Sequence, residues 1–241
     1  MKYLESDVFD ALNCALSSIE TPDEKIVGRL EAYSCKDTGD DKQLRKQLES
    51  KLLEEIEELK TPEFSFSSSI VSPFGPLDQT ASRRTFFYLI ATLNAVFPDY
   101  DFSGMRHEVF NKLPSVSMIQ NTVQNTLFKT MNSPSNFLQQ RIWTAIDETV
   151  DLANCDIYSF NPDWNCDPYS DEPTLWSHHF FFVNRYLKRI VLFTYRSVSN
   201  ISVNKDLYDD EDEFYMEDIN EDINDDRFIR YDYDRVQAMF A

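Results

Sequence analysis

Apolar residues recur every three or four positions in five stretches of the chain, the spacing that gathers them on one face of an α-helix. In the first stretch, Ser6 or Asp7 can cap the start of the helix. In the second, the stripe from Leu44 to Leu59 favours core packing over a partner-binding face, because surface helices normally bury such a stripe. The pattern predicts helices over residues 7–18, 41–60, 83–97, 115–131 and 134–150.

Aromatic and β-branched residues dominate four further segments, as is typical of β-strands. These segments are residues 26–35, 155–160, 175–183 and 187–198. The last two are joined by Asn184-Arg185-Tyr186, a connection short enough for a hairpin. Strands and helices do not alternate regularly, so a parallel sheet is not expected. The sequence therefore predicts a helical, mainly antiparallel α+β domain.

Residues 61–82 contain three prolines, one glycine and a cluster of serines, a composition that leaves few options for regular structure. We interpret this segment as a mobile linker within one domain, whose folded parts are residues 1–60 and 83–203. Phosphate groups can be added to such a linker without disturbing a core, and a plain surface loop is the equal alternative. The candidate acceptors are Thr61 and Ser72, which each precede a proline, and Ser67, Ser68 and Ser69.

Acidic residues crowd the end of the chain, where residues 206–234 hold ten Asp and four Glu against two Arg, a net charge of −12. Like charges at this density resist folding, so we expect residues 204–241 to form a disordered tail. Aromatic side chains interleaved with the carboxylates would let the tail dock on a basic surface; a purely solubilising tail is the alternative. The candidate docking residues here are Asp209, Asp210, Glu211, Asp212 and Glu213.

The 241 residues include 42 acidic and 23 basic side chains, a formal net charge of −19. Nucleic-acid binding depends on Lys and Arg at phosphates, so we expect no direct nucleic-acid binding and a protein partner with a basic surface. No run approaches the ~20 apolar residues of a membrane-spanning helix, and no membrane association is expected. Four separated cysteines without C-x-x-C spacing indicate reduced thiols in an intracellular protein.

Recognised catalytic motifs are missing from the sequence. The four glycines are isolated, which excludes a phosphate-binding glycine loop, and there is no G-x-S-x-G nucleophile motif. His178 and His179 are neighbours in a predicted strand and point to opposite faces, so one packed and one exposed histidine are expected rather than a metal site. We expect no catalytic residue, cofactor or metal. An enzyme with Asp156, Asp163 or His179 in a cleft is the rival interpretation.

Several long strings follow one another along the chain: MKYLE at residues 1–5, GRLEAYSCK at 28–36, YLIATLN at 88–94, PDYDFS at 98–103 and CDIYSFNPD at 155–163. In order and spacing they resemble the Maf family of repressors of RNA polymerase III transcription. The resemblance covers about residues 1–42 and 83–199, and leaves out the linker and the far tail.

The resemblance implies a three-layer α/β/α sandwich, with an antiparallel sheet of four to five strands between helices. It implies a negative regulator, not an enzyme, that binds RNA polymerase III and hinders its recruitment by the initiation factor TFIIIB, lowering synthesis of transfer RNA and 5S ribosomal RNA. It also implies control by nutrient-dependent kinases and phosphatases in the segment 61–82, and regulated movement between nucleus and cytoplasm.

This chain departs from the family pattern in two respects. The linker is short, and no R-R-x-S/T kinase motif is present, since Thr85 directly follows Arg83-Arg84. No convincing basic import cluster is visible.

The docking residues within the folded part are expected in irregular polar and aromatic segments, although a role in turn formation is the alternative for each. A generic acidic adaptor or a histone-binding chaperone is the rival function that composition alone allows. The candidates are Asp99, Tyr100, Asp101, Asp163, Trp164 and Asp167.

Overall fold

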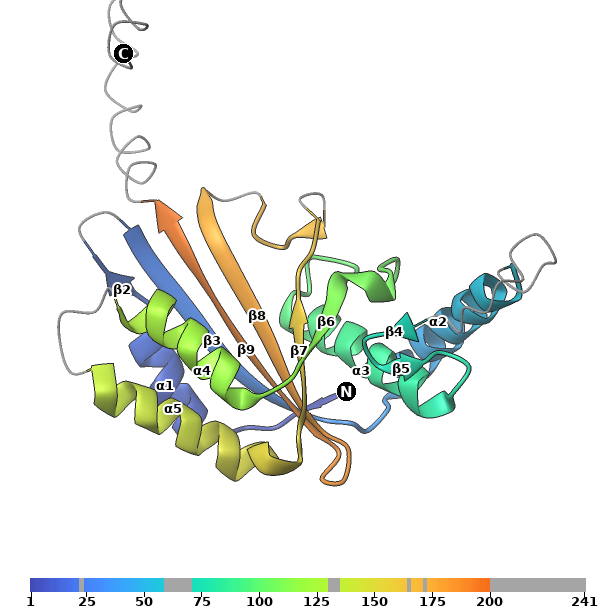
Figure 1. Ribbon diagram of the computed structural model, residues 1–241, viewed down its shortest axis with the longest axis horizontal. Helices are drawn as coiled ribbons and strands as arrows, with labels where there is room; N and C mark the ends of the chain where they lie inside the picture. Colours follow the sequence, from blue (N-terminus) through green and yellow to red (C-terminus); the bar gives the residue numbers. More distant parts are fainter. Residues whose placement is uncertain (22–23, 59–70, 130–134, 164–165, 171–172, 200–241) are drawn as a thin grey trace, which may run out of the picture. The chain divides into compact units, whose positions relative to one another are not determined.

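The computed structural model describes residues 1–21, 24–58, 71–129, 135–163, 166–170 and 173–199. An antiparallel sheet with the strand order β1-β3-β9-β8-β7-β6 forms its centre, and β2 pairs with β3 at one end (Figure 1). The strands are β1 (Lys2–Tyr3), β2 (Ile19–Glu20), β3 (Glu24–Ser34), β6 (Phe110–Leu113), β7 (Asp156–Phe160), β8 (Thr174–Asn184) and β9 (Arg189–Ser199).

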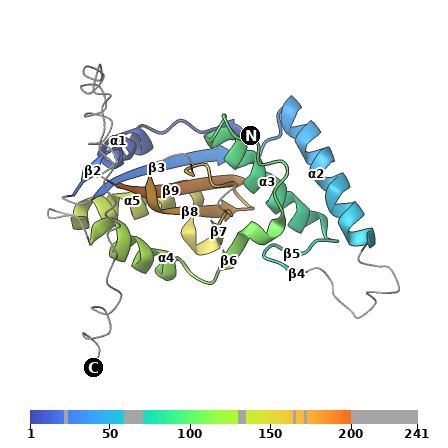
Figure 2. The same ribbon diagram turned by 90° about the horizontal axis from the view of Figure 1, so that it is seen from above.

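Helices cover both faces of the sheet, as the view from above shows (Figure 2). One face packs against α1 (Asp7–Leu16), α4 (Val116–Val123) with its π-helical continuation (Gln124–Phe128), and α5 (Ser135–Val150). The other packs against α3 (Thr80–Val96) and the small hairpin of β4 (Val71–Ser72) and β5 (Gly75–Pro76). The long helix α2 (Gly39–Glu58) packs on α3. Short 3-10 turns span His107–Val109 and Leu152–Asn154. The expected three-layer α/β/α arrangement is confirmed.

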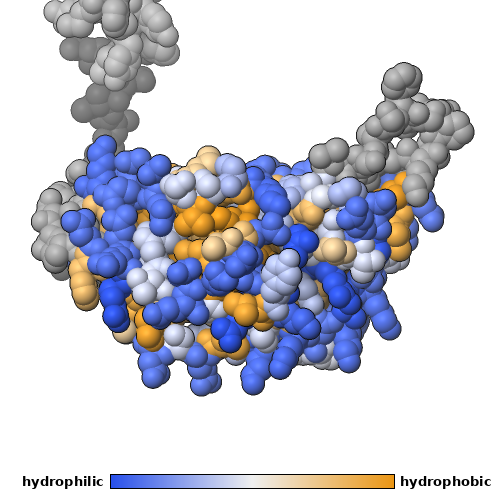
Figure 3. Space-filling model, turned by 60° about the horizontal axis from the view of Figure 1, so that its bottom comes forward, coloured by the Kyte–Doolittle hydropathy of each residue, from blue (hydrophilic) through white to orange (hydrophobic). Residues whose placement is uncertain are grey.

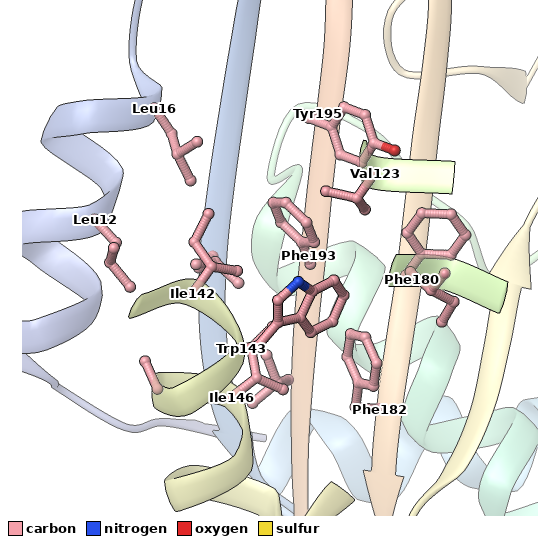
Figure 4. Packing of buried hydrophobic residues seen from close by; sticks show 14 of the residues in the cluster. Leu12, Leu16, Val123, Ile142, Trp143, Ile146, Phe180, Phe182, Phe193 and Tyr195 are labelled. Atoms are coloured by element: carbon pink, nitrogen blue, oxygen red, sulfur yellow. The ribbon is translucent and has the colours of Figure 1, made fainter. Parts of the chain in front are cut away.

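The first core lies between the sheet and helices α1, α4 and α5 (Figure 4). Phe180 and Phe182 of β8, and Phe193 and Tyr195 of β9, point into it, because alternate residues of a strand share one face. Trp143 of α5 lies edge-on to Phe182 and Phe193, with ring centroids 6.2 and 6.5 Å apart. Each such ring removed from water stabilises the fold by roughly 1.5–3 kcal/mol.

The second core, on the opposite face of the sheet, is rich in aromatic rings. Phe74, in the turn between β4 and β5, lies 5.6 Å from Phe86 of α3, 5.8 Å from Phe110 of β6 and 5.1 Å from Tyr158 of β7 between ring centroids. All four side chains are buried. This small hairpin therefore belongs to the core between α3 and the sheet.

The predicted helices and strands are all present. Ser6 caps α1, since its Oγ accepts a hydrogen bond from the amide of Phe9 at 3.4 Å. The predicted hairpin of β8 and β9 is confirmed by the pairing of Asn184 with Arg189. Within the described part of the chain the main sheet has seven strands, where four to five were expected. The sequence did not predict β1, β2 and β6, which are too short to show an alternating pattern.

The interpretation of residues 61–82 as a linker is wrong for its second part. Residues 71–82 form the β4–β5 hairpin and the first turn of α3, and they bury Phe74 and Leu77. Proline and glycine here build a tight turn rather than an irregular segment, with Gly75 at a φ of 102°. Residues 59–70 lie outside the described part of the chain.

Ser72 is not the open acceptor that the sequence indicated. It is 6% exposed, its hydroxyl donates to the Gly75 carbonyl, and it accepts from the Phe74 amide at 3.2 Å. A phosphate group at this position would disturb the hairpin. The other four candidate acceptors, Thr61, Ser67, Ser68 and Ser69, lie outside the described residues, as does the whole acidic tail.

On the face in Figure 3, apolar patches interrupt a largely hydrophilic surface. Among the described helices, none is long and apolar enough to span a membrane.

Candidate docking groove

Polar residues occupy two neighbouring rows across the central strands. Arg29 of β3 pairs with Thr194 of β9, which pairs with His179 of β8. The next row holds Arg196 of β9 and Ser177 of β8. Since alternate strand residues share a face, all five belong to the face that α3 covers. The apolar rows of this face pack under α3, whereas the polar rows lie further along the same strands.

Tyr169, from the segment between β7 and β8, covers the polar rows. Its ring stacks on His179, with centroids 5.4 Å apart and an angle of 16° between the planes. The guanidinium carbon of Arg196 lies 4.0 Å from the centroid of the same ring, a cation–π contact. Thr194 Oγ1 lies 3.3 Å from the Tyr169 hydroxyl and 2.9 Å from His179 Nδ1. These contacts fix Tyr169 against the sheet.

The His179 side chain is held in its neutral form. Burial lowers its pKa to about 3, and the nearby charges of His178 and Arg196 act in the same direction. Burial also raises the pKa of the Tyr169 hydroxyl. Both rings are therefore uncharged near neutral pH. His179 positions the Tyr169 ring, and the Tyr169 ring in turn contacts Arg196.

A groove of about 460 Å³ opens beside this network. Its floor is formed by β3 and β9, and its walls by the turn after α3 and the segment before β8. The floor is fixed in place, because the Arg29 guanidinium donates to the Val96 carbonyl at 3.3 Å and pairs with Glu31. The side chains that give the groove its polar and aromatic character are Arg29, Asp99, Tyr100, Tyr169, Thr194 and Arg196.

The structure brings two of the predicted docking residues into this groove. Asp99 is exposed and Tyr100 is half-buried, and both line the wall after α3. Asp101 is exposed next to them, and its carboxylate accepts hydrogen bonds from the amide and hydroxyl of Ser103, both at 2.9 Å. These hydrogen bonds lower the pKa of Asp101, so it is ionised at neutral pH. Asp101 therefore shapes this turn through its hydrogen bonds to Ser103, and its exposed side chain can still contact a partner.

The described candidates between β7 and β8 differ in their relation to the groove. Asp167 is half-buried, and it accepts from the Tyr169 amide at 2.9 Å, which shapes the wall of the groove. Asp163 is exposed and does not line the groove. The residues outside the described part are Trp164, Asp209, Asp210, Glu211, Asp212 and Glu213.

Sequence reasoning did not single out Arg29, Arg196, Tyr169 or Thr194. A signal was present for Arg196, which follows an apolar run in β9, since a charged residue in such a strand indicates a place where the sheet is not covered by a helix. Arg29 was harder to find, because β3 carries other charged residues. Their alignment on neighbouring strands depends on the pairing register, which a single sequence does not specify.

Two residues of the rival enzyme interpretation, Asp156 and His179, lie at different places along the sheet. Asp156 pairs with Val183 near the end of β8, four residues along the strand from His179, and it forms ion pairs with Lys112 at 2.7 Å and Arg185 at 3.1 Å. His178 and His179 point to opposite faces as predicted, but His178 is half-buried against Trp176 and Tyr195 rather than exposed.

The cysteines and the potential metal ligands were located in the described part of the chain. Burial raises the pKa of both Cys35 and Cys155 to about 12, which keeps these thiols protonated. All four cysteines are free. Within the described residues, no group of three His, Cys, Asp or Glu side chains is placed to hold a metal ion.

These features define a three-layer α/β/α protein with a polar groove on one face of its antiparallel sheet. The chain belongs to the Maf1 family, since the family model described as Maf1 regulator matches residues 26–194.

Relatives and solved structures agree with this assignment. The chain is 38% identical over 216 residues to the repressor of RNA polymerase III transcription maf1 of Schizosaccharomyces pombe, covering 88% of this chain and 90% of that one. It is 30% identical to the repressor of RNA polymerase III transcription of Dictyostelium discoideum, covering 86% and 88% of the two chains. A crystal structure of citrus MAF1 matches with a TM-score of 0.62 and 34% identity, over 80% of this chain and 99% of that one.

Proposed function

We propose that this protein represses transcription by RNA polymerase III, acting by binding rather than by catalysis. The observation that carries the proposal is the match to the S. pombe repressor over 88% of this chain and 90% of the relative, which leaves little of either protein unaccounted for. The finer mechanism we propose is direct binding to the polymerase, which hinders its recruitment by TFIIIB.

The groove beside Tyr169 is our candidate for the polymerase-binding surface. Tyrosine and arginine are enriched at protein interfaces, because each combines a large contact area with a polar group. Tyr169 is held by Thr194 and His179 and contacts Arg196, so little entropy of the Tyr169 side chain would be lost on binding. The exposed carboxylates of Asp99 and Asp101 beside it suit a partner with basic surface.

Regulation and location are further parts of the proposal. Nutrient-dependent kinases and phosphatases would act within residues 61–70, where Thr61, Ser67, Ser68 and Ser69 are the acceptors, and the protein would move between nucleus and cytoplasm. Ser72 is buried and is therefore left out of the proposed acceptors.

Binding of the full chain to purified RNA polymerase III tests the proposal, together with transcription of a transfer-RNA gene in a system reconstituted with TFIIIB. The wild-type chain is expected to bind and to lower transcript yield. Asp99→Arg combined with Tyr100→Ala should weaken binding by roughly tenfold or more, as expected when a central interface contact is lost. Asp10→Arg, on the exposed side of α1 in the opposite layer, is the control and should bind normally.

Two results would contradict the proposal at different levels. If the wild-type chain binds histones but not the polymerase, the protein is an acidic chaperone and not a repressor of this enzyme. If the polymerase binds the groove variant and the control equally well, the function stands, but the docking surface lies elsewhere.

A further inference from the structure

A second cavity, of about 510 Å³, lies at the opposite end of the sheet from Tyr169. It is enclosed by the segment between β3 and α2, the first turns of α3, and the end of the β8–β9 hairpin. Figure 1 shows this hairpin close to the segment that leads from β3 into α2. The volume is within the range of about 300–1,000 Å³ that is typical of small-molecule sites.

Basic side chains dominate the lining of this cavity. Five of them contribute, against the single carboxylate of Asp37, in a chain whose net charge is −19. This local excess of basic side chains creates a positive potential that attracts anions. The five are Lys36, Arg45, Arg84, Arg185 and Lys188.

The carboxylates nearby neutralise only part of this charge. Arg45 pairs with Asp37, and Arg185 pairs with Asp156, which also binds Lys112. Lys36, Arg84 and Lys188 form no ion pair with any residue in the described ranges. Three cations thus converge on the cavity from three different elements without an acidic partner among those residues.

The start of α3 adds to the positive potential. Gln79, the residue before the helix, makes no side-chain hydrogen bond to the first turn, and that turn contains no acidic residue. No acidic side chain of the first turn therefore offsets the positive end of the helix dipole, which lies next to Ala81 and Arg84 in the cavity wall. Tyr88 and Val183 supply an apolar portion of the wall.

We propose that this cavity binds a phosphate-bearing ligand, in contacts with Lys36, Arg84 and Lys188. Several cations around one cavity fit a ligand with more than one phosphate group, since each phosphate oxygen accepts a charge-assisted hydrogen bond. The site lies at the opposite end of the strands and of α3 from the docking groove, so a ligand here would bind at a separate place from the proposed partner.

Two sources of the phosphate fit the surroundings: a soluble polyphosphate and a lipid headgroup. The turn of the β8–β9 hairpin exposes Tyr186 and Leu187, at 87% and 49%. Apolar side chains at such a tip, flanked by Arg185 and Lys188, are able to enter a membrane surface while the cavity holds a headgroup.

Binding of inositol hexakisphosphate to the full chain, measured by titration calorimetry, tests the site. The pocket variant is Lys36→Gln, Arg84→Gln and Lys188→Gln. The control carries the same loss of charge at three exposed positions outside the cavity, Lys46→Gln, Arg106→Gln and Arg141→Gln. The pocket variant should lose at least about tenfold in affinity, and the control less than about threefold. Equal thermal unfolding of the two variants without ligand shows that the fold is intact.

Vesicles of phosphatidylcholine with or without phosphatidylinositol 4,5-bisphosphate distinguish the sources. A lipid headgroup is identified if the chain binds only the vesicles with the phosphoinositide. This binding should be lost in the pocket variant and also in the hairpin-tip variant, Tyr186→Ser with Leu187→Ser. Binding of the soluble probe, unaffected by the hairpin-tip variant, identifies a free polyphosphate. The proposal is overturned if neither probe binds, or if pocket and control variants lose affinity equally.

Discussion

His179 is a buried polar side chain that positions a residue of the candidate docking groove. Its ring lies under Tyr169 and contacts Thr194, which also reaches the Tyr169 hydroxyl. The histidine is 1% exposed, and its Nε2 atom has no hydrogen-bond partner among the described residues. A proton added to this ring would therefore be buried without compensation, beside the positive charge of Arg196.

This burial predicts a loss of stability in acid. The folded-state pKa of His179 is lowered to about 3 from the unfolded value of 6.5, so the unfolded chain binds more protons below about pH 6.5. The contribution of His179 to the free energy of unfolding is complete above that pH, and about 2 kcal/mol of it is lost by about pH 5. Urea unfolding at about pH 7.5 and about pH 5 measures the difference.

The His179→Gln variant should show a smaller difference between the two pH values, because glutamine does not titrate. His178→Gln, on the other face of the same strand, retains His179 and should keep most of the loss. A loss in His179→Gln as large as in the wild type would show that other groups cause the acid sensitivity.

At the scale of elements, the β4–β5 hairpin is a small unit with a large effect on packing. Phe74 at its turn joins α3, β6 and β7 through three ring contacts. Ser82 of α3 ties the hairpin to the helix, since its hydroxyl donates to the Phe74 carbonyl at 3.1 Å. Burial of Phe74, together with Leu77 and the hydrogen bonds of Ser72 and Ser82, thus orders a segment of low hydrophobic content.

We expect Phe74→Ala to lower the free energy of unfolding by about 3–5 kcal/mol, the usual cost of removing a buried ring and leaving a cavity. Phe137→Ala is the matched control, because Phe137 is 68% exposed, and its change should stay within about 0.5 kcal/mol. Chemical denaturation of both variants provides the comparison. Equal small effects would mean that the hairpin is not part of the cooperative core.

At the scale of the whole molecule, the sheet separates two cores and displays two polar sites at different ends of its strands. The groove beside Tyr169 is lined by Asp99 together with Arg29 and Arg196, and the exposed Asp101 lies next to it, whereas the cavity at the β8–β9 hairpin carries a surplus of cations. The net charge of −19 therefore does not describe every part of the surface. A basic partner and an anionic ligand can be bound by the same protein at separate places.

If the proposed repressor docks by charge, its binding to RNA polymerase III should weaken with salt. Exposed charges are screened over about 8 Å at physiological ionic strength, and over shorter distances in stronger salt. The association rate should fall more than the dissociation rate rises between about 50 and about 300 mM NaCl, because long-range attraction mainly speeds encounter. Surface plasmon resonance gives both rates. An unchanged association rate would rule out electrostatic steering.

The sequence by itself determined the helices, the long strands, the antiparallel α+β class and the family, since these depend on local periodicity and on long strings of residues. Only the tertiary structure decided which residues are buried in the β4–β5 hairpin and which polar residues meet across the sheet. Pro73 and Gly75 look like linker residues until Phe74 is seen between α3 and the sheet. Likewise, Arg29, Thr194 and His179 are distant in sequence and meet only through strand register. Periodicity is a property of neighbours along the chain, whereas sites depend on contacts between strands that only folding brings together.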